Sequence, residues 1–205
     1  MYVGTYVYAY QKTIVLLKDR KRLMYYVVQV KTGKEEKTIQ AIKKQLKENL
    51  KDKADLIDVF SPYKETLKKY KGEFKTVVER CFPGYIFVET DDPKELFVQL
   101  YFTPEYTKLL GREGYSYIWT PLDEDESRMI DILYSKNTNR ITKISDISIK
   151  EGDKIIVLDG PLDGLLGHVK KVNLHKRLVT VGFIMCNRPV EAELSINIVT
   201  NVVNK

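Results

Sequence analysis

Residues 151–169 read Glu-Gly-Asp-Lys-Ile-Ile-Val-Leu-Asp-Gly-Pro-Leu-Asp-Gly-Leu-Leu-Gly-His-Val. The apolar run in this stretch ends at Asp159-Gly160-Pro161, a composition typical of a tight turn. We expect Gly167 to stand where a Cβ atom would crowd the backbone as the next strand begins. Short apolar runs separated by Gly, Asp and Asn turns continue toward the C-terminus: Lys154 to Leu158, His168 to Val172, Leu178 to Phe183 and Pro189 to Leu194. This spacing predicts a small all-β barrel over residues 150–205.

The same glycines could belong to a phosphate-binding loop, because Gly160, Gly164 and Gly167 lie close together. Such a loop carries Gly-Lys-Ser or Gly-Lys-Thr and leads into a helix. Neither feature follows Gly167 in this sequence. The interpretation as turns is therefore favoured.

Residues 24–136 have a different pattern, in which extended and helical segments alternate. From Glu35 to Leu50 the apolar residues recur at helical spacing with lysines on the other sides, which predicts an amphipathic helix packed on a sheet. Start signals predict two shorter helices, Asp92 to about Tyr101 and Asp123 to about Ser135. Extended segments are expected at Tyr25 to Val30, Leu56 to Pro62 and Tyr85 to Glu89. The order of these elements predicts an α+β domain.

Two further segments complete the predicted organisation. Residues 137–149 are polar and have no clear periodicity, so we expect them to form a linker between the domains. Residues 1–23 end in Lys18-Asp19-Arg20-Lys21-Arg22, and Met24 stands where the first well-patterned strand begins. The segment is therefore interpreted either as an upstream mis-start, with Met24 the natural first residue, or as an extra strand or basic arm.

The composition points toward polyanionic partners without requiring them. Lys and Arg number 34 against 28 Asp and Glu, and the net charge is +6. Fourteen of the residues are Tyr, and aromatic rings among basic side chains can stack on bases. The alternative is that most of these rings are ordinary core and strand residues. The longest early apolar run, Ile14 to Leu17, is too short for a signal-peptide core or a membrane span, which predicts a cytoplasmic protein.

No catalytic or metal-binding pattern is found. The two cysteines, Cys81 and Cys186, have no second Cys or His at ligand spacing, so neither a disulfide framework nor a zinc site is indicated. The two histidines, His168 and His175, lie near each other without an obvious nucleophile. The acidic run Asp123 to Glu126 is accounted for by a helix N-terminus. We therefore expect neither enzymatic activity nor a cofactor.

The ordered motifs resemble one known family. The stretch from Glu151 to Val169 resembles the KOW motif at the start of NusG C-terminal domains, and Tyr25 to Glu36 resembles the opening strand and helix of the NusG N-terminal domain. Phe82-Pro83-Gly84-Tyr85-Ile86-Phe87-Val88 resembles its Pro-Gly-Tyr strand, and Thr103-Pro104 falls where the family carries a similar pair. The resemblance implies an N-terminal domain with an antiparallel sheet and flanking helices, joined to an SH3-like barrel.

The resemblance also implies a mechanism without catalysis. NusG N-terminal domains dock an aromatic-lined patch on the clamp helices of the largest RNA polymerase subunit, which suppresses pausing or termination. By position, Phe82 and Tyr85 belong to that patch, and aromatic anchors supply much of the affinity at such interfaces. The alternative is that both are ordinary core residues. A monomer is expected.

One departure from the family favours a specialised relative. Phe183 to Glu191 lacks the Phe-Gly-Arg that helps general NusG factors bind the Rho helicase or a ribosomal protein, and resembles more closely the LoaP-like antiterminators, which recognise an RNA hairpin. The barrel carries a basic cluster that we predict to bind RNA, for example a hairpin in the nascent transcript: Lys170, Lys171, His175, Lys176, Arg177 and Arg188.

Two alternative functions and the role of one further segment remain open. The protein could be a general NusG-type factor whose KOW domain binds proteins, or a ribosome-associated KOW protein, although the latter class lacks the predicted N-terminal domain. A second basic segment, with Tyr70 and Phe74 among its lysines, is interpreted either as lying near nucleic acid or as a solvated loop; its lysines are Lys64, Lys68, Lys69, Lys71 and Lys75.

Overall fold

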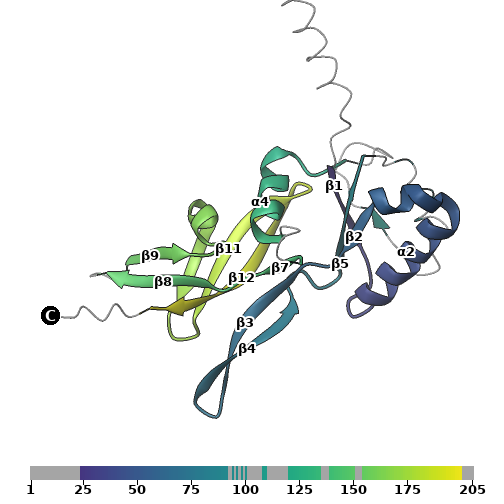
Figure 1. The fold of residues 1–205 in the computed structure, drawn as a ribbon. Coiled ribbons are helices and arrows are strands. Elements are labelled where there is room, and N and C mark those ends of the chain that lie inside the picture. The colour runs from purple at the N-terminus through teal and green to yellow at the C-terminus, as the bar shows by residue number, and fades with distance from the viewer. Residues whose placement is uncertain are drawn as a thin grey trace, which may run out of the picture.

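The computed structural model describes residues 24–91, 108–109, 120–134, 139–150 and 154–199, together with Lys94, Leu96, Val98 and Leu100. Residues 1–23, the helix start at Asp92 and the Thr103-Pro104 pair lie outside the described residues. Within the described part, the chain forms an α+β unit followed by a β-rich unit (Figure 1).

The first unit is built on an antiparallel sheet. Its strand order is β2 (Asp58–Phe60), β5 (Tyr85–Thr90), β1 (Met24–Gln29) and β6 (Lys108–Leu109). Helix α2 (Glu35–Leu50), which has the predicted bounds, packs its apolar side against one face of this sheet. The 3₁₀ helix η1 (Lys51–Leu56) then leads into β2. Alternation along the strands sends one set of side chains toward α2 and the other toward the opposite face.

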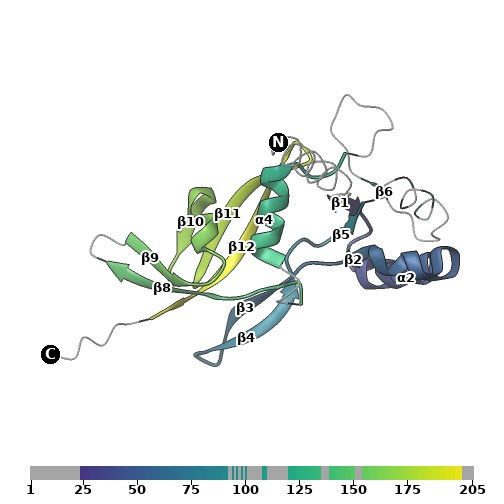
Figure 2. The same cartoon turned by 45° about the horizontal axis from the view of Figure 1, so that its top comes forward.

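The opposite face of the sheet is covered by helix α4 (Glu124–Tyr134). The predicted helix start at Asp123 is confirmed: Asp123 Oδ1 accepts the Glu126 N–H at 2.9 Å, and Glu126 Oε2 accepts the Asp123 N–H at 2.8 Å. This reciprocal capping satisfies donors that would otherwise be unpaired at the helix end. Figure 2 shows α4 between the first sheet and the strands of the second unit.

A long hairpin projects from the first unit. Strands β3 (Tyr63–Tyr70) and β4 (Glu73–Arg80) pair antiparallel, and Lys71 and Gly72 form the turn with φ of 49° and 94°. Two successive residues at positive φ suit the twist of a two-residue hairpin, and glycine adopts this conformation readily. The basic segment is therefore a paired β-hairpin and not an irregular solvated loop.

The second unit contains one five-stranded sheet. Its strands are β8 (Ser145–Lys150), β9 (Lys154–Asp159), β10 (Val169–Asn173), β11 (Leu178–Met185) and β12 (Arg188–Ile198), in the order β10-β11-β12-β8-β9. The four predicted runs all form strands, and the α+β and all-β classes of the two units are confirmed. The 3₁₀ helix η3 (Asp163–His168) joins β9 to β10, so His168 precedes the strand.

At the turn after β9, Gly160 is crowded and Gly167 is not, so the expectation for Gly167 was wrong. A Cβ atom at Gly167 would meet nothing within 4 Å. At Gly160, φ is +103° and a Cβ atom would lie 2.7 Å from Ser145 Cα. Ser145 Oγ accepts the Leu162 N–H at 3.0 Å, so the turn after β9 packs directly on the start of β8.

Residues 137–149, predicted to be an irregular linker, include regular structure among the described positions. Strand β7 (Ile141–Thr142) pairs parallel with β3, and β8 pairs parallel with β12 and antiparallel with β9. These strands depend on partners distant in sequence, which is why the local pattern resembled a linker.

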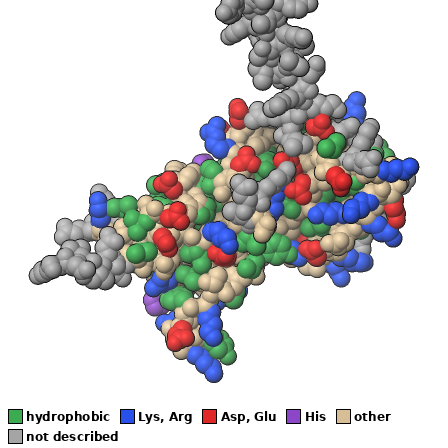
Figure 3. All heavy atoms as spheres, in the orientation of Figure 1, with side chains coloured by type: hydrophobic (Ala, Val, Ile, Leu, Met, Phe, Trp, Pro, Cys, Tyr) green, Lys and Arg blue, Asp and Glu red, His purple; other side chains and the backbone are tan. Residues whose placement is uncertain are grey.

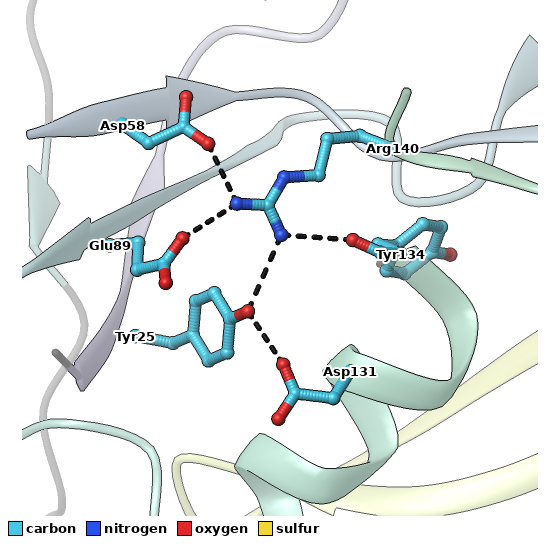
Figure 4. Close-up of polar contacts among 6 residues, drawn as sticks. All are labelled: Tyr25, Asp58, Glu89, Asp131, Tyr134 and Arg140. Atoms are coloured by element: carbon cyan, nitrogen blue, oxygen red, sulfur yellow. Dashed lines mark hydrogen bonds and ion pairs between the residues drawn. The ribbon is translucent and has the colours of Figure 1, made fainter. Parts of the chain in front are cut away.

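Arg140 anchors this connecting segment to the first unit (Figure 4). Its Nη2 donates to Asp58 Oδ2 at 2.7 Å and Glu89 Oε2 at 2.6 Å, and its Nη1 donates to the Tyr134 carbonyl at 2.9 Å. The guanidinium carbon also lies 4.1 Å from the centre of the Phe60 ring. Arg140 is buried, so its bonds hold the start of β7 on the first sheet.

Candidate nucleic-acid and polymerase interfaces

The predicted RNA-binding residues fall in two places on the second sheet. Lys170 and Lys171 are exposed on β10, and His175, Lys176 and Arg177 lie in the turn between β10 and β11. Three of these residues, Lys170, Lys171 and Lys176, line one groove together with Thr180, Glu191 and Glu193. The groove therefore combines three ammonium groups with two carboxylates.

Arg188 does not join this cluster. It begins β12 and pairs with Met185, whereas the other end of β11, Leu178, pairs with Ser195 beside the turn. At 3.3 Å per residue, Arg188 lies roughly 20 Å from the turn along the sheet. The structure thus brings together five of the six predicted residues on β10 and the turn after it.

The turn between β10 and β11 is held by a set of hydrogen bonds. Asn173 Oδ1 accepts the Lys176 N–H at 3.0 Å, and the Leu174 carbonyl accepts the Arg177 N–H at 3.2 Å. The Arg177 carbonyl accepts the Ile196 N–H at 3.0 Å. The Arg177 side chain donates from Nη1 to Asn197 Oδ1 at 3.2 Å. These bonds fix the backbone that presents Lys176 and Arg177.

The basic hairpin of the first unit lies beside this turn, which the sequence pattern did not indicate. The Arg177 guanidinium carbon is 4.8 Å from the centre of the Phe74 ring on β4. Figure 3 shows Lys and Arg side chains around the tip of the hairpin. Lys64 is an exception, since it is buried and donates to the Glu193 carbonyl at 2.7 Å.

The candidate polymerase-binding residues lie at the turn that enters β5. Phe82 is only 4% exposed, and its ring packs on Phe87, Tyr134 and Phe183. Tyr85 is partly buried against the same core. Phe183 belongs to β11, so the second unit covers Phe82 in this arrangement.

Among the described residues, three hydrogen bonds accompany this contact between the two units. Glu126 Oε1, on α4, accepts the Cys186 N–H at 2.9 Å. On β12, Ser195 Oγ accepts the Leu67 N–H at 3.0 Å, and the Glu193 carbonyl accepts from Lys64. Buried polar groups of each unit thus find their partners in the other, which favours the packed arrangement.

Glu35 supports the turn that carries Phe82 and Tyr85. Its Oε1 accepts the Gly84 N–H at 2.7 Å, and its Oε2 lies 3.5 Å from Arg80 Nε. Burial by itself raises the pKa of Glu35, but backbone hydrogen bonds from Gly84, Glu35 and Gly33 and the Arg80 charge outweigh burial, so the pKa is lowered. The carboxylate is therefore stabilised in its charged form.

Replacing Glu35 by Gln is expected to flatten the acid limb of the stability curve. Because the folded-state pKa is lowered, Glu35 stabilises the protein above its unfolded-state pKa of about 4.3, and this contribution disappears as the pH falls through the folded-state value. Urea unfolding between neutral and acidic pH measures the effect. Glu36→Gln is the control, since Glu36 is exposed and accepts a hydrogen bond 3.2 Å long from the side chain of Gln40, which is exposed as well. Equal acid limbs for wild type and Glu35→Gln would contradict the assignment.

Other chemistry is limited in the described part of the chain. No group of three His, Cys, Asp or Glu suited to a metal ion occurs among the described residues. Burial raises the pKa of the Cys81 thiol, which makes it a weak nucleophile. Among the described helices, none is long and apolar enough to cross a membrane.

Comparisons with known proteins place the chain in a family. A family model described as "Transcription termination factor nusG" matches residues 23–131. The NusG proteins of Staphylococcus aureus strains Mu50 and N315, each named a transcription termination/antitermination protein, are 28% identical over 171 residues, covering 82% of this chain and 91% of theirs. A solved structure described as "Domain interaction in Thermotoga maritima NusG" is 18% identical, with a TM-score of 0.49, covering 85% of this chain and 94% of that one. The family match spans more than half of the sequence, and the chain belongs to the NusG family of transcription factors.

Proposed function

We propose that this protein is a transcription elongation and antitermination factor that binds RNA polymerase through its first unit and contacts RNA through its second. The observation that carries the proposal is the family match over residues 23–131, which covers most of the unit that we propose binds RNA polymerase. The basic residues of β10 and the following turn support the RNA contact. The changed sequence at Phe183 to Glu191 supports a specialised, LoaP-like role.

Polymerase docking through Phe82 and Tyr85 requires the second unit to move away. Phe82 is covered by Phe183, and an aromatic anchor contributes to binding only when its ring reaches the partner. We therefore propose two arrangements, a packed one and an open one, of which only the open one presents Phe82 to the clamp helices. The proposed monomer and the proposed cytoplasmic location are compatible with this mechanism.

The proposal is tested by transcription with purified polymerase on templates that carry a terminator after a leader hairpin. We expect the full-length protein to increase readthrough, and the Lys170→Ala, Lys171→Ala variant to lose the part of the effect that depends on the hairpin. The same variant is expected to lower RNA affinity and to reduce the slope of log affinity against log salt by roughly 2, because two phosphate contacts are lost.

The matched control is Lys43→Ala with Lys47→Ala, which removes two exposed lysines from α2 and keeps the same net charge as the test variant. Unchanged RNA binding at low and high salt in the Lys170, Lys171 variant would exclude these lysines. Readthrough that depends on polymerase but not on the hairpin would favour a general factor whose second unit binds proteins. Association with ribosomal subunits in place of polymerase would favour the ribosomal class.

A further inference from the structure

The two faces of the β3–β4 hairpin differ in charge balance. Residues paired across an antiparallel ribbon share a face, and consecutive residues alternate between faces. Lys69 pairs with Phe74, whereas the adjacent pair, Lys68 with Lys75, lies on the other face. On that other face Lys68 Nζ is 2.6 Å from Glu79, so part of the positive charge is already offset.

The face that carries Lys69 and Phe74 continues into the second unit. Arg177 lies over the Phe74 ring, and Lys176 precedes it in the turn. Across the part of the chain that the structure describes, none of Lys69, Lys176 and Arg177 forms an ion pair with a carboxylate. Their charges are therefore available to an external anion, and they come from both units.

The pairing of Arg177 with Phe74 suits a base as well as a phosphate. A guanidinium is planar, so when it lies over an aromatic ring its outer face can stack on an unpaired base while its edge donates to phosphate oxygens. Flanking lysines supply point charges for the backbone of a stem. A duplex without unpaired bases has nothing to stack on the guanidinium, so only the charges of these side chains would attract it.

We propose that Lys69, Phe74, Lys176 and Arg177 form one RNA-binding surface across both units, which takes a stem-loop RNA with an unpaired base on Arg177. The inference rests on the proposed RNA contact of the second unit and extends it to the first. The groove that holds Lys170 and Lys171 also contains Lys176, so this surface is continuous with the residues assigned to RNA above. The hairpin of the first unit thus contributes to recognising the RNA.

The test measures binding of the full-length protein to a labelled stem-loop RNA, to the same stem as a blunt RNA duplex, and to a DNA stem-loop of the same sequence. Lys69→Glu is expected to lower stem-loop RNA affinity roughly tenfold, because it replaces a phosphate contact by a repulsion. Lys75→Glu, with the same charge change on the other face of the hairpin, is expected to leave the affinity within about twofold.

A second variant tests the stacking. Arg177→Lys keeps the charge but loses the planar guanidinium, so we expect roughly tenfold weaker binding of the stem-loop RNA and unchanged binding of the blunt duplex. Equal losses for both RNAs would overturn the stacking contact, and equal affinity for the DNA stem-loop would overturn the assignment to RNA.

The outcomes also separate this inference from the proposed function. Wild-type protein that fails to retain the stem-loop RNA at physiological salt would overturn both. Binding that is lost in the Lys170→Ala, Lys171→Ala variant but unchanged in Lys69→Glu would overturn the surface across both units and leave the proposed function standing. Equal losses of affinity in Lys69→Glu and Lys75→Glu would indicate an unspecific charge effect, and they would also overturn the surface across both units.

Discussion

Phe183→Ala is expected to raise the affinity of the protein for RNA polymerase about tenfold or more. The Phe183 and Phe82 ring centres are 5.8 Å apart in an edge-to-face contact, and truncating a buried phenylalanine costs about 3 kcal/mol or more. The contact between Phe183 and Phe82 exists only in the packed arrangement, so its loss destabilises that arrangement relative to the open one. The fraction of molecules in the open arrangement therefore rises. Apparent affinity follows the fraction of the state that is competent to bind.

Polymerase binding measured by retention on immobilised enzyme tests this prediction. Ile184→Ala is the matched control, since Ile184 is the next residue of β11 and is 52% exposed. Ser195→Ala removes the acceptor of the Leu67 N–H and should act in the same direction with a smaller effect, without a cavity in the core. If the units separate and polymerase affinity stays at the wild-type level, Phe82 is not part of the docking surface.

Phe183→Ala should also lower the affinity of the protein for stem-loop RNA. The contact between Arg177 and Phe74 exists only while the two units are packed, so opening them removes Lys69 from the RNA-binding surface. We expect the protein to capture RNA in the packed arrangement and to keep only the second-unit contacts once polymerase has opened it. Separate measurements of RNA and polymerase binding on one preparation of Phe183→Ala decide whether the two effects are linked.

The second large effect is expected for Arg140→Ala, which should lower the free energy of unfolding by about 3 kcal/mol. The substitution leaves Asp58 and Glu89 without the guanidinium that lies 2.7 and 2.6 Å from their oxygens. Arg140→Lys should restore little, because one ammonium group cannot reproduce the planar fork that also donates to the Tyr134 carbonyl. The midpoint and slope of urea unfolding measure the change.

Lys143→Ala provides the comparison in the same segment. Lys143 Nζ lies 2.6 Å from Glu65, but its side chain is 53% exposed, and exposed pairs contribute about 1 kcal/mol or less. A loss for Arg140→Ala no larger than for Lys143→Ala would show that the buried network does not hold the connecting segment.

Only part of the candidate site could be predicted from the sequence. The lysines of β10 and the following turn were found because they are close along the chain. Arg188 was expected on a connection next to this turn, but it starts β12 beside Met185, at the end of β11 far from the turn. The sequence does not connect Lys69 and Phe74 with Arg177, because nothing local in either segment encodes a contact between the hairpin and the second unit.

The sequence by itself determined the elements whose signals are local. Helix α2 follows from its apolar period, the start of α4 from Asp123 and the acidic residues that follow it, and strands β9 to β12 from short runs between turns. Side-chain period and turn chemistry act over a few residues, so they can be recognised without a partner.

Only the tertiary structure decided how the units meet. The parallel pairing of β8 with β12, the burial of Phe82 beneath Phe183 and the bonds of Arg140 each join residues far apart in the chain. Such contacts depend on which faces the whole fold brings together, and a polar, aperiodic segment looks like a linker until its partners are in place. The physical reason is that long-range pairing and packing stabilise these positions, whereas local propensity does not.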